Sequence, residues 1–422
     1  MQTLRIGDKG AEVALLQKGL KRAGASLATD GIFGRETERA VRAFQSRQGL
    51  AADGIAGVQT ERSLAPWLRG YAVHTIRRGD TLWRLAARYD TTLLALETAN
   101  PALDPFNLRP GQSIVVPFSF SVVPTDIPFS SALTEYCVRG LAARYPFMQT
   151  EMIGKSVLAK PIYALSFGEG TRRVLYNAEH HANEWITVPL LLRYAEELVR
   201  AAASGESVYG YPADEILFRC RLTLVPAVNP DGLDLVTGAL RGAAYERCAS
   251  IAADYPAIPF PNGWKANARG VDLNLQYPAE WTRAREIKFS QGFISPAPRD
   301  YVGTAPLTEP ESAALSAYTR QIDPALILAY HTQGGVIYWK YLDREPEDSR
   351  ALAERFAAVS GYTYEETPYA SGFAGYKDWF IQDYDRPGYT VEAGMGDNPL
   401  PLSQFESIYA ANRGILTLAA LG

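Results

Sequence analysis

The sequence predicts an α/β protein built from three modules: a small three-helix domain over residues 1–68, a βααβ module over residues 72–118 and a large α/β domain over residues 129–422. Three observations predict this arrangement. A short glycine-rich motif occurs twice near the N-terminus, a strand–helix–helix–strand pattern follows it, and apolar runs then alternate with helical stretches. A chain of 422 residues is long enough for two or three domains.

The first module contains an internal repeat. The segment DGIFGRET at residues 30–37 recurs as DGIAGVQT at residues 53–60, and each copy is typical of a glycine-rich turn that leads into a helix. Helical faces are predicted around these copies, at Val13, Leu16, Gln17 and Leu20 and at Ala40, Val41 and Phe44. The doubled motif resembles the peptidoglycan-binding domain found beside many bacterial cell-wall hydrolases. The alternative is a helical bundle without a ligand.

The second module begins with HTIRRGDTLW at residues 74–83 and ends with LRPGQSIVVP at residues 108–117. Between these segments the pattern predicts two short helices, and Asn100-Pro101 ends the second of them. The two segments resemble the LysM module, which implies recognition of glycans that contain N-acetylglucosamine. We expect His74 to be an ordinary strand residue and Trp83 to lie in the core rather than form a sugar platform.

Four apolar runs in the large domain are typical of strands, at residues 173–176, 222–228, 325–330 and 388–391. Polar residues follow these runs closely, at His181, Asn229–Gly232, His331 and Glu392. Open α/β sheets carry their ligand sites at the carboxyl ends of their strands. The sequence therefore predicts that these polar residues share one site.

Three of the four histidines fall in or near this site. His181 and Glu184 are three residues apart, so both point to one face if a helix begins there. With the distant His331 they make a three-ligand zinc site whose fourth position is open to water, an arrangement suited to hydrolysis. His180 is the rival ligand, and we expect it to have a packing role.

Residues 129–422 resemble the zinc carboxypeptidase family, because its motifs occur in the family's order: IGKS at residues 153–156, HANEW at 181–185, NPDG at 229–232, GVDLN at 270–274 and Glu392. The resemblance implies a mixed sheet and one Zn²⁺ per chain, bound by His181, Glu184 and His331. It also implies that Asp272 orients a ligand histidine and that Glu392 is the general base acting on metal-activated water.

Two further roles are implied by the same resemblance, and each has two candidates. Arg269 is our choice for stabilising the oxyanion, with Lys265 as the alternative, because some relatives place an arginine directly after the tryptophan. Tyr369 matches the family's mobile active-site tyrosine, with Tyr376 as the alternative.

The chain departs from the family where carboxypeptidases bind a free C-terminus. They usually place arginine after the asparagine of this motif, and here Leu275 follows Asn274. We expect Asn274 still to contact substrate. Lys377 is expected in the pocket for the residue after the scissile bond, where it would favour an acidic group; a surface lysine is the alternative.

These departures, with the two wall-binding modules, resemble the bacterial γ-D-glutamyl-meso-diaminopimelate peptidases. The implied function is zinc-dependent hydrolysis of the γ-D-Glu–meso-diaminopimelate bond in peptidoglycan stem peptides. One alternative is a metallocarboxypeptidase that releases a C-terminal residue from wall peptides. The other is a non-catalytic wall-binding protein on the same fold.

The composition limits which classes of partner and which cellular location the sequence predicts. The net charge of −4, without runs of like charge, indicates neither nucleic acid nor a membrane surface as a partner. Three cysteines without paired spacing predict buried, reduced thiols. No signal-peptide pattern is present, so we expect a bacterial protein of cytoplasmic origin, with possible wall association or action in a sporulating mother cell.

Overall fold

The computed structural model describes residues 3–422, and its first module is the predicted three-helix unit. The helices are α1 (Ala11–Arg22), α2 (Arg35–Arg47) and α3 (Val58–Arg69). The second glycine of each copy of the repeat directly precedes a helix, Gly34 before α2 and Gly57 before α3. Each helix buries its apolar face against the others, as the helical spacing predicts.

The repeat extends further than its motif, because each copy is closed by a buried glutamine. Gln17 donates to Asp30 Oδ1 at 2.8 Å and to Thr37 Oγ1 at 3.0 Å. Gln45 makes the same bonds one repeat later, to Asp53 at 2.8 Å and to Thr60 at 3.1 Å. Both glutamine side chains also accept a bond from the glycine after the aspartate. The two copies are therefore alike in structure as well as in sequence.

The second module has the predicted βααβ order: β1 (Tyr71–Thr75), α4 (Leu82–Tyr89), α5 (Leu93–Ala99) and β2 (Ser113–Pro117), with β1 antiparallel to β2. His74 is a buried strand residue, hydrogen-bonded to Asp80 and Tyr89. The prediction for Trp83 was wrong, because its side chain is 70% exposed. Helix α4 turns Leu82, Leu85 and Ala86 to the core, so Trp83 lies on its outer face.

The large domain is built on a mixed sheet of eight strands in the order β11-β10-β12-β9-β5-β8-β4-β3. Their bounds are β3 (Gln149–Lys155), β4 (Pro161–Phe167), β5 (Arg172–Ala178), β8 (Cys220–Val225), β9 (Leu326–His331), β10 (Val336–Tyr338), β11 (Thr363–Glu365) and β12 (Gly388–Glu392). The neighbours β12, β9, β5 and β8 run parallel, and they are the four strands predicted from the apolar runs. The outer pairings of β10 with β12, β8 with β4 and β4 with β3 are antiparallel, which makes the sheet mixed.

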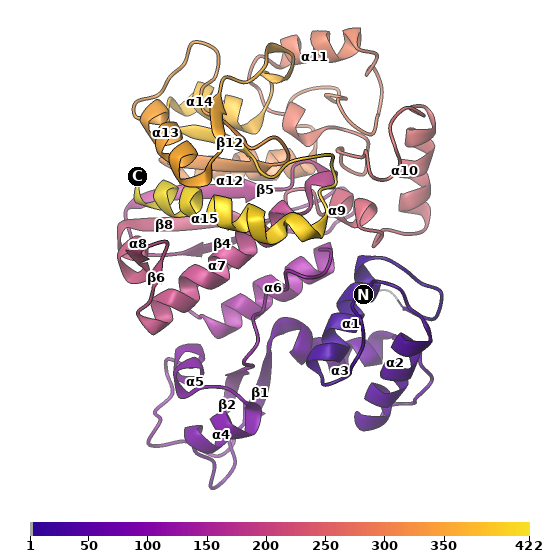
Figure 1. Ribbon diagram of the computed structural model, residues 1–422, viewed down its shortest axis with the longest axis vertical. Helices are drawn as coiled ribbons and strands as arrows, with labels where there is room; N and C mark the ends of the chain where they lie inside the picture. Colours follow the sequence, from indigo (N-terminus) through magenta and orange to yellow (C-terminus); the bar gives the residue numbers. More distant parts are fainter. Residues whose placement is uncertain (1–2) are drawn as a thin grey trace.

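Helices cover both faces of the sheet (Figure 1). One face packs on α6 (Ser131–Arg144), α7 (Thr187–Ser204), α8 (Ala213–Arg219), α13 (Ser349–Ser360) and α15 (Phe405–Leu421). The other packs on α12 (Pro310–Ile322) and α14 (Tyr376–Tyr384), and α11 (Trp281–Ser290) contributes Ala284 and Ile287 to the same apolar cluster. Helices α9 (Pro230–Val236) and α10 (Ala243–Ala253) follow β8, and the short strands β6 (Ser207–Val208) and β7 (Tyr211–Pro212) precede α8. The central strands are thus buried on both sides, which explains their continuous apolar sequences.

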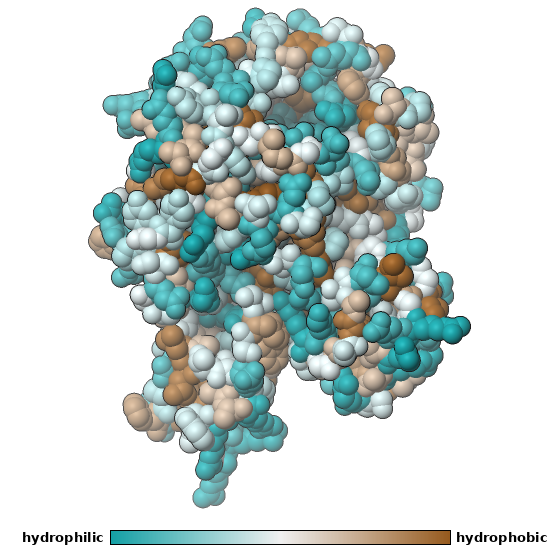
Figure 2. All heavy atoms as spheres, viewed as in Figure 1, coloured by the Kyte–Doolittle hydropathy of each residue, from teal (hydrophilic) through white to brown (hydrophobic). Residues whose placement is uncertain are grey.

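The two small modules form separate lobes below the large domain in the view of Figure 1. Hydrophilic residues predominate on the face shown in Figure 2. The connector after β2 is held by buried Glu196 on α7, which accepts the backbone N–H groups of Val122 and Val123 at 2.6 and 2.9 Å. The first module also touches the large domain directly, through Arg241 and Asp8 at 2.7 Å. No helix within residues 3–422 is long and apolar enough to cross a membrane.

Candidate active site

The site lies at the carboxyl ends of the central parallel strands. His331 ends β9 and Glu392 ends β12, and the two residues are directly paired in the register of these strands. Glu184 ends the short 3₁₀ turn η1 (Ala182–Glu184), which follows β5, and His181 directly precedes that turn. The strand order therefore brings residues that are up to 211 positions apart in the sequence (392 − 181) to one edge of the sheet.

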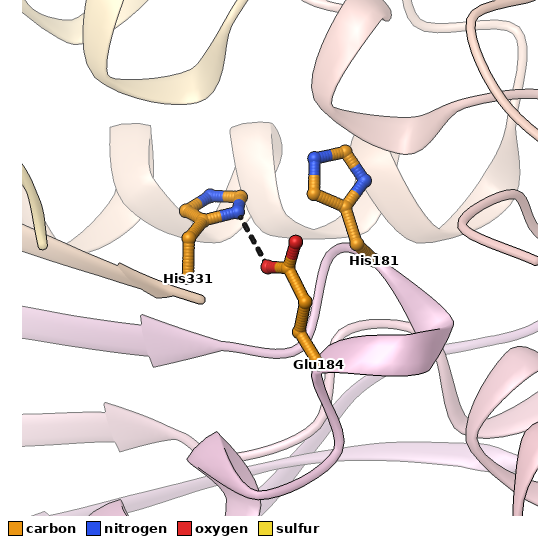
Figure 3. A group of neighbouring side chains, drawn as sticks. All are labelled: His181, Glu184 and His331. Carbon is orange, nitrogen blue, oxygen red and sulfur yellow. Dashed lines mark hydrogen bonds and ion pairs between the residues drawn. The ribbon is translucent and has the colours of Figure 1, made fainter. Parts of the chain in front are cut away.

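His181, Glu184 and His331 form one group, the candidate metal-binding group, whose ligand atoms all lie within 4.8 Å of one another. Figure 3 shows the three side chains converging, with His331 Nδ1 3.0 Å from Glu184 Oε2. His181 Nδ1 and His331 Nε2 are buried and have no hydrogen-bond partner within residues 3–422. Because His181 Nδ1 faces the Asp272 carboxylate, the Nε2 atom of His181 is the one left for a metal. Two imidazoles, each with a nitrogen atom available, and a carboxylate fit a zinc ion, with a fourth position left for water.

Asp272 supports the first of these histidines. Its Oδ1 atom lies 3.4 Å from His181 Nδ1. The carboxylate is itself held by the backbone N–H groups of Asn274, at 3.2 Å, and of Asp300, at 3.1 Å. Burial, together with the nearby Asp300 carboxylate, raises the pKa of Asp272. A carboxylate held in this position can orient the imidazole that faces it.

Lys265 is the cation closest to the metal-binding group, with its Nζ atom 2.9 Å from Glu184 Oε1. Burial acts to raise the pKa of Glu184, but Lys265, His181 and His331 outweigh it and hold that pKa below its ordinary value. The same pairing raises the pKa of Lys265 against the effect of burial. The site therefore contains a charged lysine next to its ligand carboxylate.

The Arg269 side chain does not reach the carboxylate of Glu184. Its side chain is 53% exposed and lies 3.5 Å from Glu309. It is not among the residues that line the cavity next to His181, whereas Lys265 is. Of the two candidates for stabilising the oxyanion, the geometry favours Lys265 over Arg269, because only Lys265 faces the atoms that would react.

Glu392 lines the same cavity as His181 and His331. Burial raises its pKa to about 7; the Glu184 carboxylate adds to this rise, and His331 and Lys265 oppose it. A carboxylate whose pKa lies near neutrality can both accept and donate a proton at neutral pH. Its position and its pKa fit the general base that the sequence predicts at this residue.

His180 lies behind the metal-binding group. Its Nε2 atom is 2.9 Å from the Tyr277 hydroxyl, and its ring stacks on His331 with centroids 5.7 Å apart. Burial, followed by the neighbouring His331, lowers its pKa well below the ordinary value. The residue is placed for packing, and the metal-binding group forms without it.

The two candidate tyrosines differ sharply in exposure. Tyr376 is fully buried and its hydroxyl is 2.8 Å from Thr319 Oγ1, so its side chain is not available to a substrate. Tyr369 is 67% exposed in the short turn η3 (Tyr369–Ser371). The flanking residues Pro368 and Ser371 line the cavity. The structure thus leaves Tyr369 as the tyrosine that could move over the site.

The cavity has a volume of about 200 Å³, and Asn274, Leu275 and Lys377 line it. Lys377 is only 3% exposed, so the surface alternative was wrong. Its ammonium lies 2.6 Å from Asp378 and donates to the Lys340 carbonyl at 2.7 Å. Leu275 presents an apolar side chain where the family usually has arginine, and the cavity therefore lacks that cation at this position.

Sequence reasoning missed three charged residues in the cavity wall, Lys288, Arg299 and Asp300. They belong to α11 and to the loop that precedes α12, where no strand or helix pattern marks the segment SPAPRDY at residues 295–301. A charged Arg-Asp pair inside a proline-containing loop is the signal that could have drawn attention to them. Their approach to His181 is visible only after folding.

Comparisons with known proteins agree with this geometry. Residues 134–413 match the zinc carboxypeptidase family, residues 9–64 match a peptidoglycan-binding domain and residues 74–117 match the LysM domain. The chain is 44% identical over 278 residues to "Gamma-D-glutamyl-L-diamino acid endopeptidase 1" of Lysinibacillus sphaericus, covering 66% of this chain and 68% of that protein. It is 39% identical over 292 residues to an uncharacterized Bacillus subtilis protein, covering 68% and 76%.

Solved structures are similar in fold. A carboxypeptidase A from Helicoverpa armigera aligns with a TM-score of 0.55 at 18% identity, covering 99% of this chain and 98% of that one. Bovine thrombin-activatable fibrinolysis inhibitor aligns with a TM-score of 0.53 at 17% identity, covering 70% of this chain and 97% of that one. At such identities the likeness concerns the fold, which is the mixed α/β fold that the sequence predicts.

Proposed function

Because this chain belongs to the zinc carboxypeptidase family, we propose that it hydrolyses the γ-D-glutamyl–meso-diaminopimelate bond of peptidoglycan stem peptides. The family makes it a metallopeptidase. The observation that carries the choice of bond is that the site keeps His181, Glu184, His331 and Glu392 but has Leu275 where a clamp for a free C-terminus would be. The similarity to a peptidase named for γ-D-glutamyl substrates supports the same bond.

His181, Glu184 and His331 would hold one zinc ion per chain, with Asp272 orienting His181. When bound, zinc polarises the scissile carbonyl and lowers the pKa of an attacking water to about 7. Glu392 takes a proton from that water and later returns it to the leaving nitrogen. Lys265 stabilises the charge that develops on the carbonyl oxygen, and Tyr369 approaches from its turn as the substrate enters.

Asn274 and Lys377 would contact the substrate from the cavity wall. Asn274 Oδ1 accepts the backbone N–H of Tyr376 at 3.0 Å, which leaves its side-chain amide nitrogen as a donor. The ammonium of Lys377 is held at the base of the pocket by Asp378.

The N-terminal modules support binding to peptidoglycan and association with the bacterial wall. We propose that the LysM module binds N-acetylglucosamine-containing strands. Tethering the active site to the wall in this way raises the effective concentration of stem peptides around it.

The test is to incubate the zinc-loaded protein with L-Ala-γ-D-Glu-meso-diaminopimelate, with and without a terminal D-Ala, and to identify products by mass spectrometry. Release of L-Ala-D-Glu is the expected result. Release of D-Ala alone would make the protein a metallocarboxypeptidase acting on wall peptides. A protein with one bound zinc and no product from either peptide would refute the proposed substrate.

A further inference from the structure

The cavity that contains the metal-binding group is lined by four cationic side chains, from Lys265, Lys288, Arg299 and Lys377. Three of them are committed to carboxylates of the protein. Lys265 pairs with Glu184 at 2.9 Å, Lys288 with Asp300 at 2.6 Å and Lys377 with Asp378 at 2.6 Å. Since a lysine ammonium acts as a single point charge, each of these lysines has its main charge partner inside the protein.

Arg299 is the exception, because a guanidinium has more donors than its one partner uses. Its Nε atom donates to Asp300 Oδ2 at 2.7 Å. No hydrogen bond within residues 3–422 engages its two terminal nitrogen atoms, and the side chain is 42% exposed in the cavity wall. One end of the guanidinium is therefore anchored, while the terminal amino groups remain for a ligand.

The backbone around Arg299 is tied to both sides of the active site. The carbonyl of Pro298 accepts the N–H groups of Lys265 and Ala266, at 2.8 and 2.9 Å. Asp300 N–H donates to Asp272 Oδ2 at 3.1 Å, and Asp272 N–H donates to the Tyr301 carbonyl at 2.8 Å. Asp300 itself has a φ of +66°, a conformation that is costly for a residue with a side chain. The loop holds Arg299 in place before substrate arrives.

We propose that Arg299 binds a carboxylate of the stem peptide next to the scissile bond and so provides the guanidinium that Leu275 does not. This inference rests on the proposed function. A planar guanidinium with two free donors matches a carboxylate through paired, charge-assisted hydrogen bonds. The substrate offers such groups on both sides of the bond: the α-carboxylate of D-Glu and the carboxylates of the diaminopimelate residue. Either would be recognised by the same chemistry.

The test compares wild type with Arg299→Gln on four peptides. These are L-Ala-γ-D-Glu-meso-diaminopimelate, the same peptide with the D-Glu α-carboxylate as an amide, with L-Lys in place of diaminopimelate, and with its C-terminal carboxylate as an amide. Arg299→Gln should lower kcat/KM roughly 10- to 100-fold on the parent peptide, mainly through KM. One of the modified peptides lacks the carboxylate that Arg299 binds. On that peptide Arg299→Gln and wild type should have the same kcat/KM, and this result identifies the carboxylate.

Two companion variants exclude trivial effects. Arg299→Lys keeps the positive charge but loses the paired donors of the guanidinium. Its affinity for the parent peptide should therefore lie between those of Arg299→Gln and wild type. Arg285→Gln removes an exposed arginine from α11, where it covers Phe289 away from the cavity, and should leave all four rates unchanged. Zinc content is measured for every variant, because a loss of metal would lower all rates together.

Binding of the uncleaved peptides to Glu392→Gln, with and without Arg299→Gln, gives a readout that needs no turnover. A Kd that rises for the parent but not for one of the three modified peptides supports the assignment. An equal change on all four peptides, or none on any, overturns it. If wild type cleaves none of the peptides the proposed function fails, whereas cleavage that is indifferent to Arg299 removes only this inference.

Discussion

Glu184 has more polar neighbours than a simple metal ligand requires. His331, Lys265 and the N–H of Thr332 all lie within 3.2 Å of its carboxylate oxygens. Without these contacts a buried carboxylate would be costly. The fold therefore surrounds the Glu184 carboxylate with donors and positive charge, and the roles of these neighbours can be separated by single substitutions.

Glu392→Gln should remove the base without disturbing the metal. Glutamine keeps the size of the side chain but cannot take up the proton, so we expect kcat to fall by roughly 10²- to 10⁴-fold. Zinc content, measured by elemental analysis, should stay at the wild-type level, because Glu392 does not belong to the metal-binding group. Near-normal turnover would show that another residue is the base.

Lys265→Met and Arg269→Met distinguish the two candidates for the oxyanion. Loss of a donor aimed at the developing charge typically costs 10²- to 10³-fold in kcat. We expect that loss for Lys265→Met and a change within a few fold for Arg269→Met, in steady-state assays on the parent stem peptide. The reverse order would restore the assignment made from the sequence.

Zinc removal should expose the second role of Lys265. Chelation is expected to abolish activity. It should also lower the thermal midpoint, because the folded protein loses the free energy of zinc binding. Lys265→Met should lower the thermal midpoint of the chelated protein more than that of the zinc-loaded protein, because bound zinc would give the buried Glu184 carboxylate a second positive partner besides Lys265. Equal shifts would mean that the ion pair does not support Glu184.

At the scale of elements, the duplicated motif works because a glutamine from the preceding helix closes each turn. Gln17 and Gln45 are each only 2% exposed, and each bonds the aspartate, the glycine and the threonine of its own copy. The motif therefore encodes a turn whose polar groups are satisfied by a residue outside it.

Gln45→Met should destabilise the end of the first module. The substitution keeps the volume but leaves the Gly54 N–H and Thr60 without their partner, which costs about 1–3 kcal/mol. Hydrogen exchange of the α3 amides measures this cost locally. Gln48→Met, an exposed position just after the same helix, is the matched control and should change exchange little. Similar effects of both would argue against the turn as the cause.

Helix α4 offers a second matched pair, since its two faces differ in burial. Leu85→Ala removes a side chain that is 1% exposed and should cost about 2–5 kcal/mol. Trp83→Ala removes a larger side chain that is mostly in solvent, and should cost less than about 1 kcal/mol. Chemical denaturation of the two variants tests whether the tryptophan belongs to the core.

At the scale of the whole molecule, the first module is docked on the catalytic domain. Arg241 pairs with Asp8 at 2.7 Å, and the Ala11 N–H donates to the Thr237 carbonyl at 3.0 Å. Burial acts to raise the pKa of Asp8, but the hydrogen bonds from Arg241 and from the Arg5 backbone lower it overall. A lowered pKa means that this contact stabilises docking above the ordinary pKa of aspartate and is lost as pH falls through the lower value.

Docking should therefore weaken in acid and in Arg241→Met. Exchange of the Ala11 amide, which is bonded across the interface, is the measurement. We expect a lower protection factor for this amide in Arg241→Met at neutral pH, and in wild type below about pH 4. Arg35→Met, on the exposed side of α2, should leave this exchange unchanged. Unchanged protection in Arg241→Met would mean that backbone contacts alone hold the module.

The sequence alone determined the three modules and the four central strands, and it predicted the candidate zinc ligands. These follow from local signals: a doubled turn motif, apolar runs of strand length, and His181 and Glu184 spaced on one turn. Only the tertiary structure placed Lys265 rather than Arg269 beside Glu184, buried Tyr376, exposed Trp83 and brought Arg299 into the cavity. Loops carry no periodicity, and burial and ion pairing depend on contacts between distant segments, so these features arise only when the chain has folded.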